Sequence, residues 1–120
     1  MRLEGWQRAQ LLRPHLVDGP PFAGDQEFLG LSRYPNVYLK LTPLNVEPND
    51  WGKATPETFY SALMKAYGAN RIAWGSNFPA TEGTLKEILG KAQRAWSFAN
   101  ASDREWVFGK TALELYPSLK

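Results

Sequence analysis

The sequence predicts an α/β fold in which short strands alternate with amphipathic helices. Residues 37–42 and 72–76 are short apolar segments of strand length, and each is followed by a segment with apolar residues at helical spacing. Strands joined through helices form right-handed crossovers, so we expect a parallel sheet. The chain has 120 residues, of which 43% are hydrophobic, which is enough for one domain spanning residues 1–120.

The first quarter of the chain predicts two short helices separated by a loop. Residues 3–12 could form a helix that Pro14 ends, with an apolar side made of Leu3, Trp6 and Leu11 or Leu12. Residues 18–24 contain four Gly or Pro, so we expect a loop there. Asp25 can then cap a second helix, whose apolar residues are Phe28, Leu31 and Tyr34.

The strand at residues 37–42 is the first convincing one, and its side chains alternate in character. Val37, Leu39 and Leu41 fall on one face, which we expect to pack under helices, while Tyr38, Lys40 and Thr42 fall on the other. A buried Lys is costly unless it is paired or contacts an anion. Lys40 is therefore a candidate contact for a substrate carboxylate, with Thr42 beside it. The alternative is that Lys40 reaches the rim of the sheet or pairs with a structural acid.

A loop and a well-marked helix follow this strand. Residues 42–50 could form part of a lid over a site or be a plain connection. Trp51 is a candidate pocket residue, although aromatic side chains serve more often in core packing. Thr55 and Pro56 predict the start of a helix and Gly68 its end. The helix has an apolar face formed by Phe59, Ala62, Leu63, Ala66 and Tyr67.

The segment at residues 71–79 is the most informative in the chain, because an apolar strand runs into a Gly-Ser-Asn-Phe-Pro turn. Gly75 lets another backbone or a ligand come close, and Pro79 stops the strand. Asn77 is thereby placed at the carboxyl end of a parallel strand, where α/β enzymes have their sites. Asn77 is our first candidate for a functional residue. The alternative is that it only closes the turn before Pro79.

Two further helices are expected in the last third of the chain. One begins at Thr81 and has an apolar face formed by Leu85, Ile88, Leu89, Ala92 and Trp96. The other begins at a capping box spanning residues 102–105.

The composition argues against several classes of function. The 14 Lys and Arg are interleaved with 12 Asp and Glu, so no basic stripe indicates nucleic-acid binding. The absence of cysteine excludes disulfides and thiolate metal sites, and it favours a cytoplasmic, reducing compartment. The amino-terminal residues lack the apolar run of a signal peptide, and no stretch has the length of a membrane helix.

Three segments resemble one known family in the order in which that family has them. Residues 71–79, Arg-Ile-Ala-Trp-Gly-Ser-Asn-Phe-Pro, resemble the last barrel strand of the amidohydrolase family, which includes lactonases of aromatic-acid breakdown and related decarboxylases. Residues 33–42 resemble the preceding strand, and residues 108–117 resemble the closing helix. The resemblance covers roughly residues 16–117.

This resemblance implies part of a (β/α)8 TIM barrel. A complete barrel needs about 250 residues, so the chain corresponds to the last two or three βα units and a carboxy-terminal helix. In the family the position of Asn77 is usually an Asp that acts in catalysis or binds metal. Asn77 can orient a carbonyl or a water, but it cannot act as a general base.

His15 is the second candidate catalytic residue, because a histidine closes an earlier strand in the family. Alignment on residues 18–21 would instead put that position near Gln10, and a partly exposed loop histidine is the alternative. His15 is the only histidine in the chain. The resemblance implies a divalent metal such as zinc for the complete family enzyme, but a zinc site usually takes three protein ligands. We do not expect the chain to bind zinc by itself.

Two functions follow as hypotheses. The first is that the chain is the carboxy-terminal piece of a hydrolase for a small lactone or another cyclic or aromatic carboxylate, with an incomplete site of its own. The second is a non-catalytic module that binds a partner or a second copy. Open strand edges favour homo-oligomers in either case.

Overall fold

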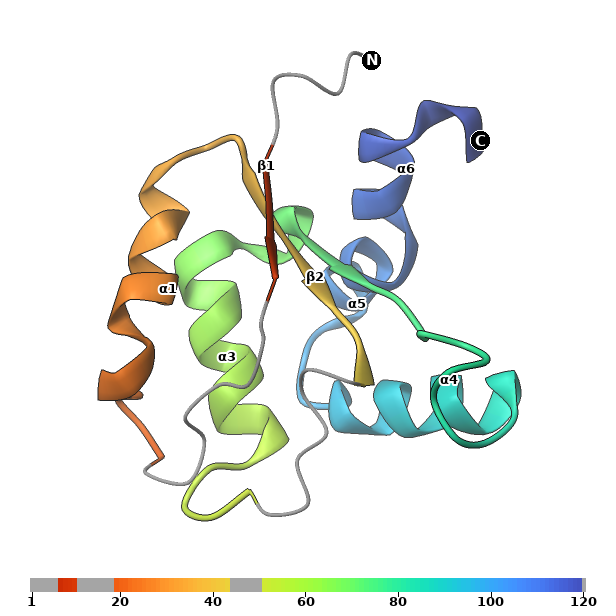
Figure 1. Cartoon of the computed structure of the whole chain (residues 1–120), viewed down its shortest axis with the longest axis horizontal. Helices are drawn as coiled ribbons and strands as arrows, with labels where there is room; N and C mark the ends of the chain where they lie inside the picture. The colour runs from red at the N-terminus through yellow and green to blue at the C-terminus, as the bar shows by residue number, and fades with distance from the viewer. Residues whose placement is uncertain (1–6, 11–18, 44–50, 120) are drawn as a thin grey trace.

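The computed structural model describes residues 7–10, 19–43 and 51–119. Its centre is a three-stranded sheet in the order β1, β2, β3, with all neighbours parallel (Figure 1). The strands are β1 (Gln7–Gln10), β2 (Val37–Leu41) and β3 (Ile72–Trp74). The predicted α/β class and the parallel sheet are therefore confirmed.

Helices occupy most of the rest of the described chain. Before and after β2 come α1 (Gln26–Gly30) and α3 (Pro56–Tyr67), which lie side by side in Figure 1. After β3 come α4 (Leu85–Ala95), α5 (Ala101–Glu105), a π-helical segment (Trp106–Lys110) and α6 (Thr111–Leu115). Within the described ranges, no helix has both the length and the apolar character needed to cross a membrane.

The core lies between the sheet and the helices. Val37, Leu39 and Leu41 of β2 are all buried, as the alternation predicted, and Ile72 of β3 is in register with Leu39. Aromatic rings extend this core beyond α3, since Tyr60 stacks on Trp96 with ring centroids 4.7 Å apart. The opposite face of the sheet carries Lys40, which is exposed.

The best-predicted helix is α3. The Thr55 side chain accepts a hydrogen bond from the backbone N–H of Thr58, and the Thr58 side chain accepts one from Thr55 in return. The helix ends at Gly68, which has φ of 82°, a left-handed conformation that favours glycine. The short helix expected after Asp25 is also present as α1.

Three local expectations were wrong. The helix expected over residues 3–12 is contradicted by strand β1, because the edge of β2 offers hydrogen bonds that local sequence cannot reveal. Helix α4 begins after Thr84 rather than at Thr81, whose N–H bonds to the Asn77 carbonyl in a turn. Helix α5 is capped by the Asn100 side chain, which accepts from the N–H of Asp103, so residues 102–105 do not form the start.

One side chain joins the starts of β2 and β3. The Arg71 guanidinium donates to the carbonyls of Tyr67, Tyr34 and Ser32, each at 2.9 Å. It also lies 5.2 Å from the centre of the Tyr67 ring. Burial raises the pKa of the Tyr67 hydroxyl above its usual 10.0, and the Arg71 charge partly opposes this. The same hydroxyl donates to the Phe28 carbonyl at 2.8 Å, which ties α1 to α3.

Candidate functional site

The candidate site lies where β2 and β3 end side by side. Lys40 is in register with Ala73, so their side chains share the face opposite the core. The pairing continues one step further, because the Gly75 N–H donates to the Leu41 carbonyl at 2.8 Å. This places Gly75 next to Thr42 at the carboxyl edge of the sheet.

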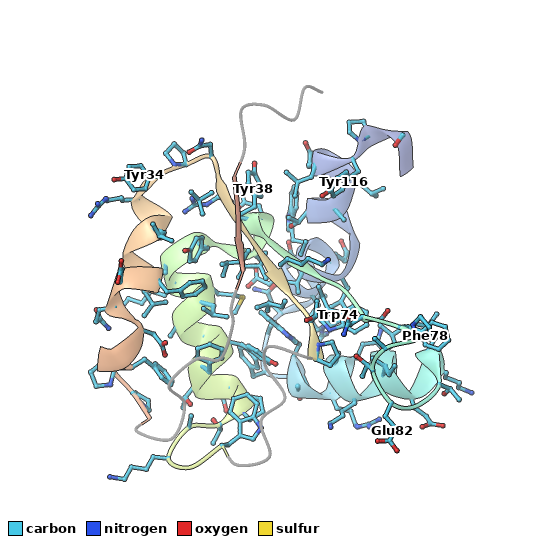
Figure 2. The ribbon with its side chains drawn as sticks, in the orientation of Figure 1. Tyr34, Tyr38, Trp74, Phe78, Glu82 and Tyr116 are labelled. Atoms are coloured by element: carbon cyan, nitrogen blue, oxygen red, sulfur yellow. The ribbon has the colours of Figure 1, made fainter. Side chains whose placement is uncertain are left out.

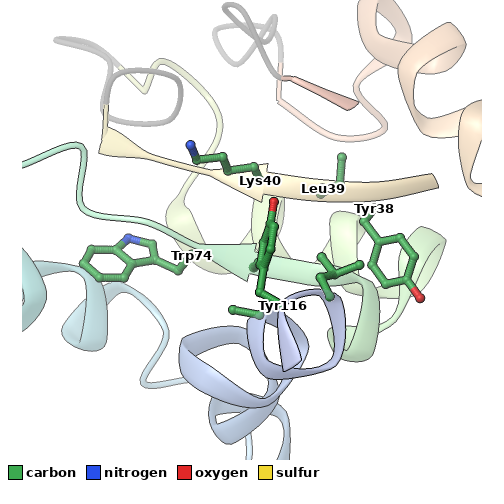
Figure 3. Close-up of a pocket in the computed structure, with 8 residues that line it drawn as sticks. Tyr38, Leu39, Lys40, Trp74 and Tyr116 are labelled. Carbon is green, nitrogen blue, oxygen red and sulfur yellow. The ribbon is translucent and has the colours of Figure 1, made fainter. Parts of the chain in front are cut away.

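The Lys40 side chain runs along the sheet toward this carboxyl edge. Its Cα is opposite Ala73, yet its Cε lies 3.6 Å from the position that a Cβ on Gly75 would take, two residues further along. Figure 3 shows the side chain extended along β2. Among the described residues no carboxylate forms an ion pair with Lys40. The fold therefore delivers an exposed cation to the rim of the sheet, as the alternative for Lys40 predicted, and parallel sheets place their sites at this rim.

Gly75 leaves the space that Lys40 uses. A Cβ at this position would touch Lys40 Cε at 3.6 Å and Thr42 Cγ2 at 3.8 Å, which are ordinary contacts. Alanine therefore fits, whereas a branched side chain would meet the lysine stem. The neighbours of Gly75 here are side chains of the adjoining strand, so the approach of a backbone or a ligand stays a prediction.

Asn77 stands in the turn that follows β3 and is exposed. It has φ of 55°, which Asn tolerates better than most residues other than glycine. Its carbonyl accepts from the N–H of Thr81 at 3.0 Å, and the Ser76 hydroxyl accepts from the N–H of Phe78 at 3.1 Å. The backbone of Asn77 closes the turn, while its side chain remains accessible at the carboxyl end of β3.

The other candidates differ in their surroundings. Thr42 is buried, with only 7% of its surface exposed, and it lies beside Gly75 and Lys40. Trp51 is half-buried and packs edge-on against Phe59 and Tyr60, with ring centroids 6.5 and 6.2 Å away. The structure thus brings Lys40 and Thr42 together, and it places Trp51 against the core side of α3.

His15 lies outside the described residues, so its predicted role stays a prediction. Within the ranges that the structure describes, no three His, Cys, Asp or Glu side chains gather as a metal site would require. Asn77 offers only a neutral amide oxygen. The described residues therefore do not by themselves fit a catalytic metal.

A cavity of about 170 Å³ lies on the Lys40 face, between the sheet and α6, and was not foreseen from sequence (Figure 3). Its walls are mostly apolar, and its lining residues are Tyr38, Leu39, Lys40, Ala73, Trp74, Ala112, Leu115 and Tyr116. Strand alternation already put Tyr38 on this face. No local signal could bring Tyr116 to it, because that contact depends on how α6 folds back.

The match to a family model decides the assignment. The model described as amidohydrolase matches residues 19–118. The chain belongs to the amidohydrolase family. The predicted resemblance to this family is thereby confirmed.

Solved structures of amidohydrolases have a similar fold. An amidohydrolase from Burkholderia multivorans with bound zinc is 21% identical, with a TM-score of 0.68. The comparison covers 93% of this chain and 44% of that one. A Pseudomonas putida protein assigned as a 2-pyrone-4,6-dicarboxylic acid hydrolase is 21% identical, with a TM-score of 0.64, covering 92% and 42%. No match was found among curated proteins.

The chain thus spans less than half the length of the amidohydrolases that it resembles in structure. Its described residues contribute two strand ends, an exposed lysine and an exposed asparagine.

Proposed function

We propose that this chain supplies the last βα units of a (β/α)8 hydrolase barrel that acts on a small lactone or another cyclic or aromatic carboxylate. The observation that carries the proposal is the course of Lys40 along the sheet face opposite the core to the carboxyl edge. There it stands beside Thr42 and on the strand next to the one that leads to Asn77. The family match supports the reaction class.

The substrate class follows from the charge at this edge. The Pseudomonas putida neighbour is assigned as a hydrolase of 2-pyrone-4,6-dicarboxylic acid, which is a cyclic ester with two carboxylates. A substrate of that kind needs cations at the rim of its site, and Lys40 supplies one. The ammonium group would bind a carboxylate through charge-assisted hydrogen bonds.

Asn77 would act by position rather than by proton transfer. In hydrolysis of a cyclic ester, water adds to the carbonyl carbon, the ring C–O bond breaks, and the released oxygen takes up a proton. The Asn77 amide can donate to the carbonyl oxygen or hold the water, but it cannot remove the proton from that water. The base must therefore come from elsewhere in the complete protein, and we expect no turnover of 2-pyrone-4,6-dicarboxylate by the 120-residue chain itself.

Carboxylate binding can be tested on the chain without any turnover. Titration with 2-pyrone-4,6-dicarboxylate, followed by NMR shifts of the residues around Lys40, should give saturable binding that weakens with added salt. Lys40→Gln should weaken this binding roughly fivefold, since an exposed charge pair contributes about 1 kcal/mol. Lys65→Gln is the matched control, because Lys65 is exposed on α3.

The steric role of Gly75 gives a second variant at the same site. Gly75→Val should weaken binding as much as Lys40→Gln, because its methyl groups would displace the lysine stem, while Gly75→Ala should bind as the wild type does. Binding that is unaffected by Lys40→Gln would refute the assignment of Lys40 as the carboxylate contact. Hydrolysis by the isolated chain would refute the view that its site is incomplete.

The non-catalytic module expected as an alternative is not favoured, because the family match and both neighbours point to amidohydrolases.

A further inference from the structure

The turn after β3 carries a large aromatic side chain to the surface. Phe78 is 50% exposed, whereas Ile72, which strand alternation would put on the same face, is fully buried. The positive φ of Asn77 interrupts the alternation between them. Figure 2 shows Phe78 on the segment that leads from Trp74 to α4, at the periphery of the molecule. The ring is thus turned out of the core at the carboxyl end of β3.

Hydrogen bonds within the turn hold the backbone around Phe78. Its own N–H donates to the Ser76 hydroxyl at 3.1 Å, and the Asn77 carbonyl accepts from the N–H of Thr81 at 3.0 Å. Among the described residues no other aromatic ring lies against the Phe78 ring. A single exposed apolar side chain is ordinary on a protein surface. Phe78 differs because its backbone is held in place directly beside Asn77, at the edge to which Lys40 extends.

Phe78 also lies within the reach of a ligand bound to Lys40. The Lys40 Cε lies 3.6 Å from the position of a Cβ on Gly75, and Phe78 follows Gly75 by three residues. Three residues span at most about 10 Å even when fully extended. This distance is short enough for one ring that carries a carboxylate to meet both the ammonium group and the Phe78 ring.

A phenyl ring distinguishes between two kinds of ring in such a ligand. Aromatic rings attract one another in offset-stacked or edge-to-face arrangements, with centroids roughly 4.5–7 Å apart. A saturated ring is puckered and has no π-system, so that only the burial of apolar surface remains.

We propose that Phe78 is a specificity-determining residue, whose ring packs against the planar, conjugated ring of a ligand that Lys40 holds by its carboxylate. This assignment rests on the proposed function and narrows its substrate to planar rings, in preference to saturated ones. Lys40 supplies the affinity for the carboxylate, and Phe78 supplies the selection of the ring.

Two dicarboxylates of equal charge test the assignment on the 120-residue chain. These are isophthalate, which has a planar aromatic ring, and hexahydroisophthalate, its fully saturated counterpart. Titrations followed by NMR should show that the wild type binds isophthalate roughly fivefold more tightly. Phe78→Ala should abolish this preference by weakening the binding of isophthalate alone, and Phe78→Tyr, which keeps the ring, should restore it. Lys40→Gln should weaken the binding of both ligands equally.

Leu85→Ala is the matched control, because Leu85 is also 50% exposed, at the start of α4. It should change the binding of neither ligand. In the wild type, a nuclear Overhauser effect should connect the ring protons of isophthalate with those of Phe78, which a merely structural role of Phe78 would not produce.

The outcomes separate this inference from the proposed function. If Lys40→Gln weakens both ligands but Phe78→Ala keeps the preference, or weakens both ligands equally, only the role of Phe78 is overturned. Absence of the Overhauser effect in saturated wild type overturns that role as well. If the wild type binds neither dicarboxylate, the proposed function fails and the role of Phe78 fails with it.

Discussion

Replacing Arg71 should loosen the start of both site-bearing strands, because its guanidinium makes three hydrogen bonds to two other segments of the chain. It donates to the carbonyl of Tyr67 at the end of α3 and to those of Tyr34 and Ser32 before β2, all at 2.9 Å. It also stands over the Tyr67 ring at 5.2 Å. Arg71 itself immediately precedes β3, so its contacts fix β3 against the entry to β2.

The magnitude follows from these contacts and from the freedom that the side chain gains on release. Each bond from a charged donor contributes roughly 1 kcal/mol at this half-buried position, and the ring contact about 0.5 kcal/mol. Against this total, ordering an Arg side chain costs roughly 1.5–2 kcal/mol. Arg71→Ala should therefore lower the free energy of unfolding by about 2 kcal/mol. Arg71→Lys keeps the charge but cannot reach three carbonyls, so it should lose about 1 kcal/mol.

Thermal unfolding followed by circular dichroism measures the effect. For a chain of this length, a loss of 2 kcal/mol corresponds to a fall in Tm of roughly 8 °C. Arg33→Ala is the matched control, because Arg33 also stands over a tyrosine ring and bonds to the Tyr34 hydroxyl at 3.0 Å, but at the surface. It should shift Tm by less than about 2 °C. An Arg71→Ala variant that melts with Arg33→Ala would refute the clamp.

Three further predictions concern single side chains. Because the pKa of the Tyr67 hydroxyl is raised in the folded protein, its contribution to stability is complete below the unfolded pKa near 10 and is lost as the pH rises through the folded pKa. The urea midpoint of the wild type should therefore fall toward that of Tyr67→Phe above pH 10. A difference between the two midpoints that does not change with pH would contradict this. Asn77→Gly should leave the free energy of unfolding nearly unchanged, and Asn77→Ala should lower it by about 1 kcal/mol because of the positive φ. If both variants also lose binding of 2-pyrone-4,6-dicarboxylate, the Asn77 side chain is functional. If Asn77→Gly binds normally, Asn77 serves only to form the turn. Thr111→Val should lower the free energy of unfolding in urea by about 1 kcal/mol, because it removes the buried 2.9 Å hydrogen bond from the Thr111 hydroxyl to the Ala69 carbonyl. That carbonyl still accepts a hydrogen bond from the N–H of Ile72 in the variant, so the loss stays small. Thr111→Ser retains the hydroxyl and should lose less, and a larger loss for Thr111→Ser than for Thr111→Val would contradict a role for this bond.

Features encoded over a few neighbouring residues could be predicted. The start of α3 at Thr55 and Pro56 and its end at Gly68 were foreseen, because caps and backbone conformations are properties of the local chain. The alternation in residues 37–42 also gave the correct faces, since side chains in a strand point to opposite sides whatever their partners. The choice between nearby caps was harder. Thr84 and Asn100 are as suitable as the residues we expected, and only the hydrogen bonds formed distinguish them.

Features that depend on distant partners could not be predicted. Residues 7–10 carry no strand pattern of their own, and they form β1 because β2 offers an edge to bond to. The course of Lys40 over Gly75 and the contacts of Arg71 join segments more than thirty residues apart in the chain. The sequence by itself determined the α/β class, the main helix, the faces of β2 and the turn that carries Asn77, because these follow from local backbone preference and side-chain periodicity. The tertiary structure alone decided strand β1, the direction of the Lys40 side chain and the cavity lined by Tyr116, because hydrogen bonds and packing between remote segments have no signature within either segment.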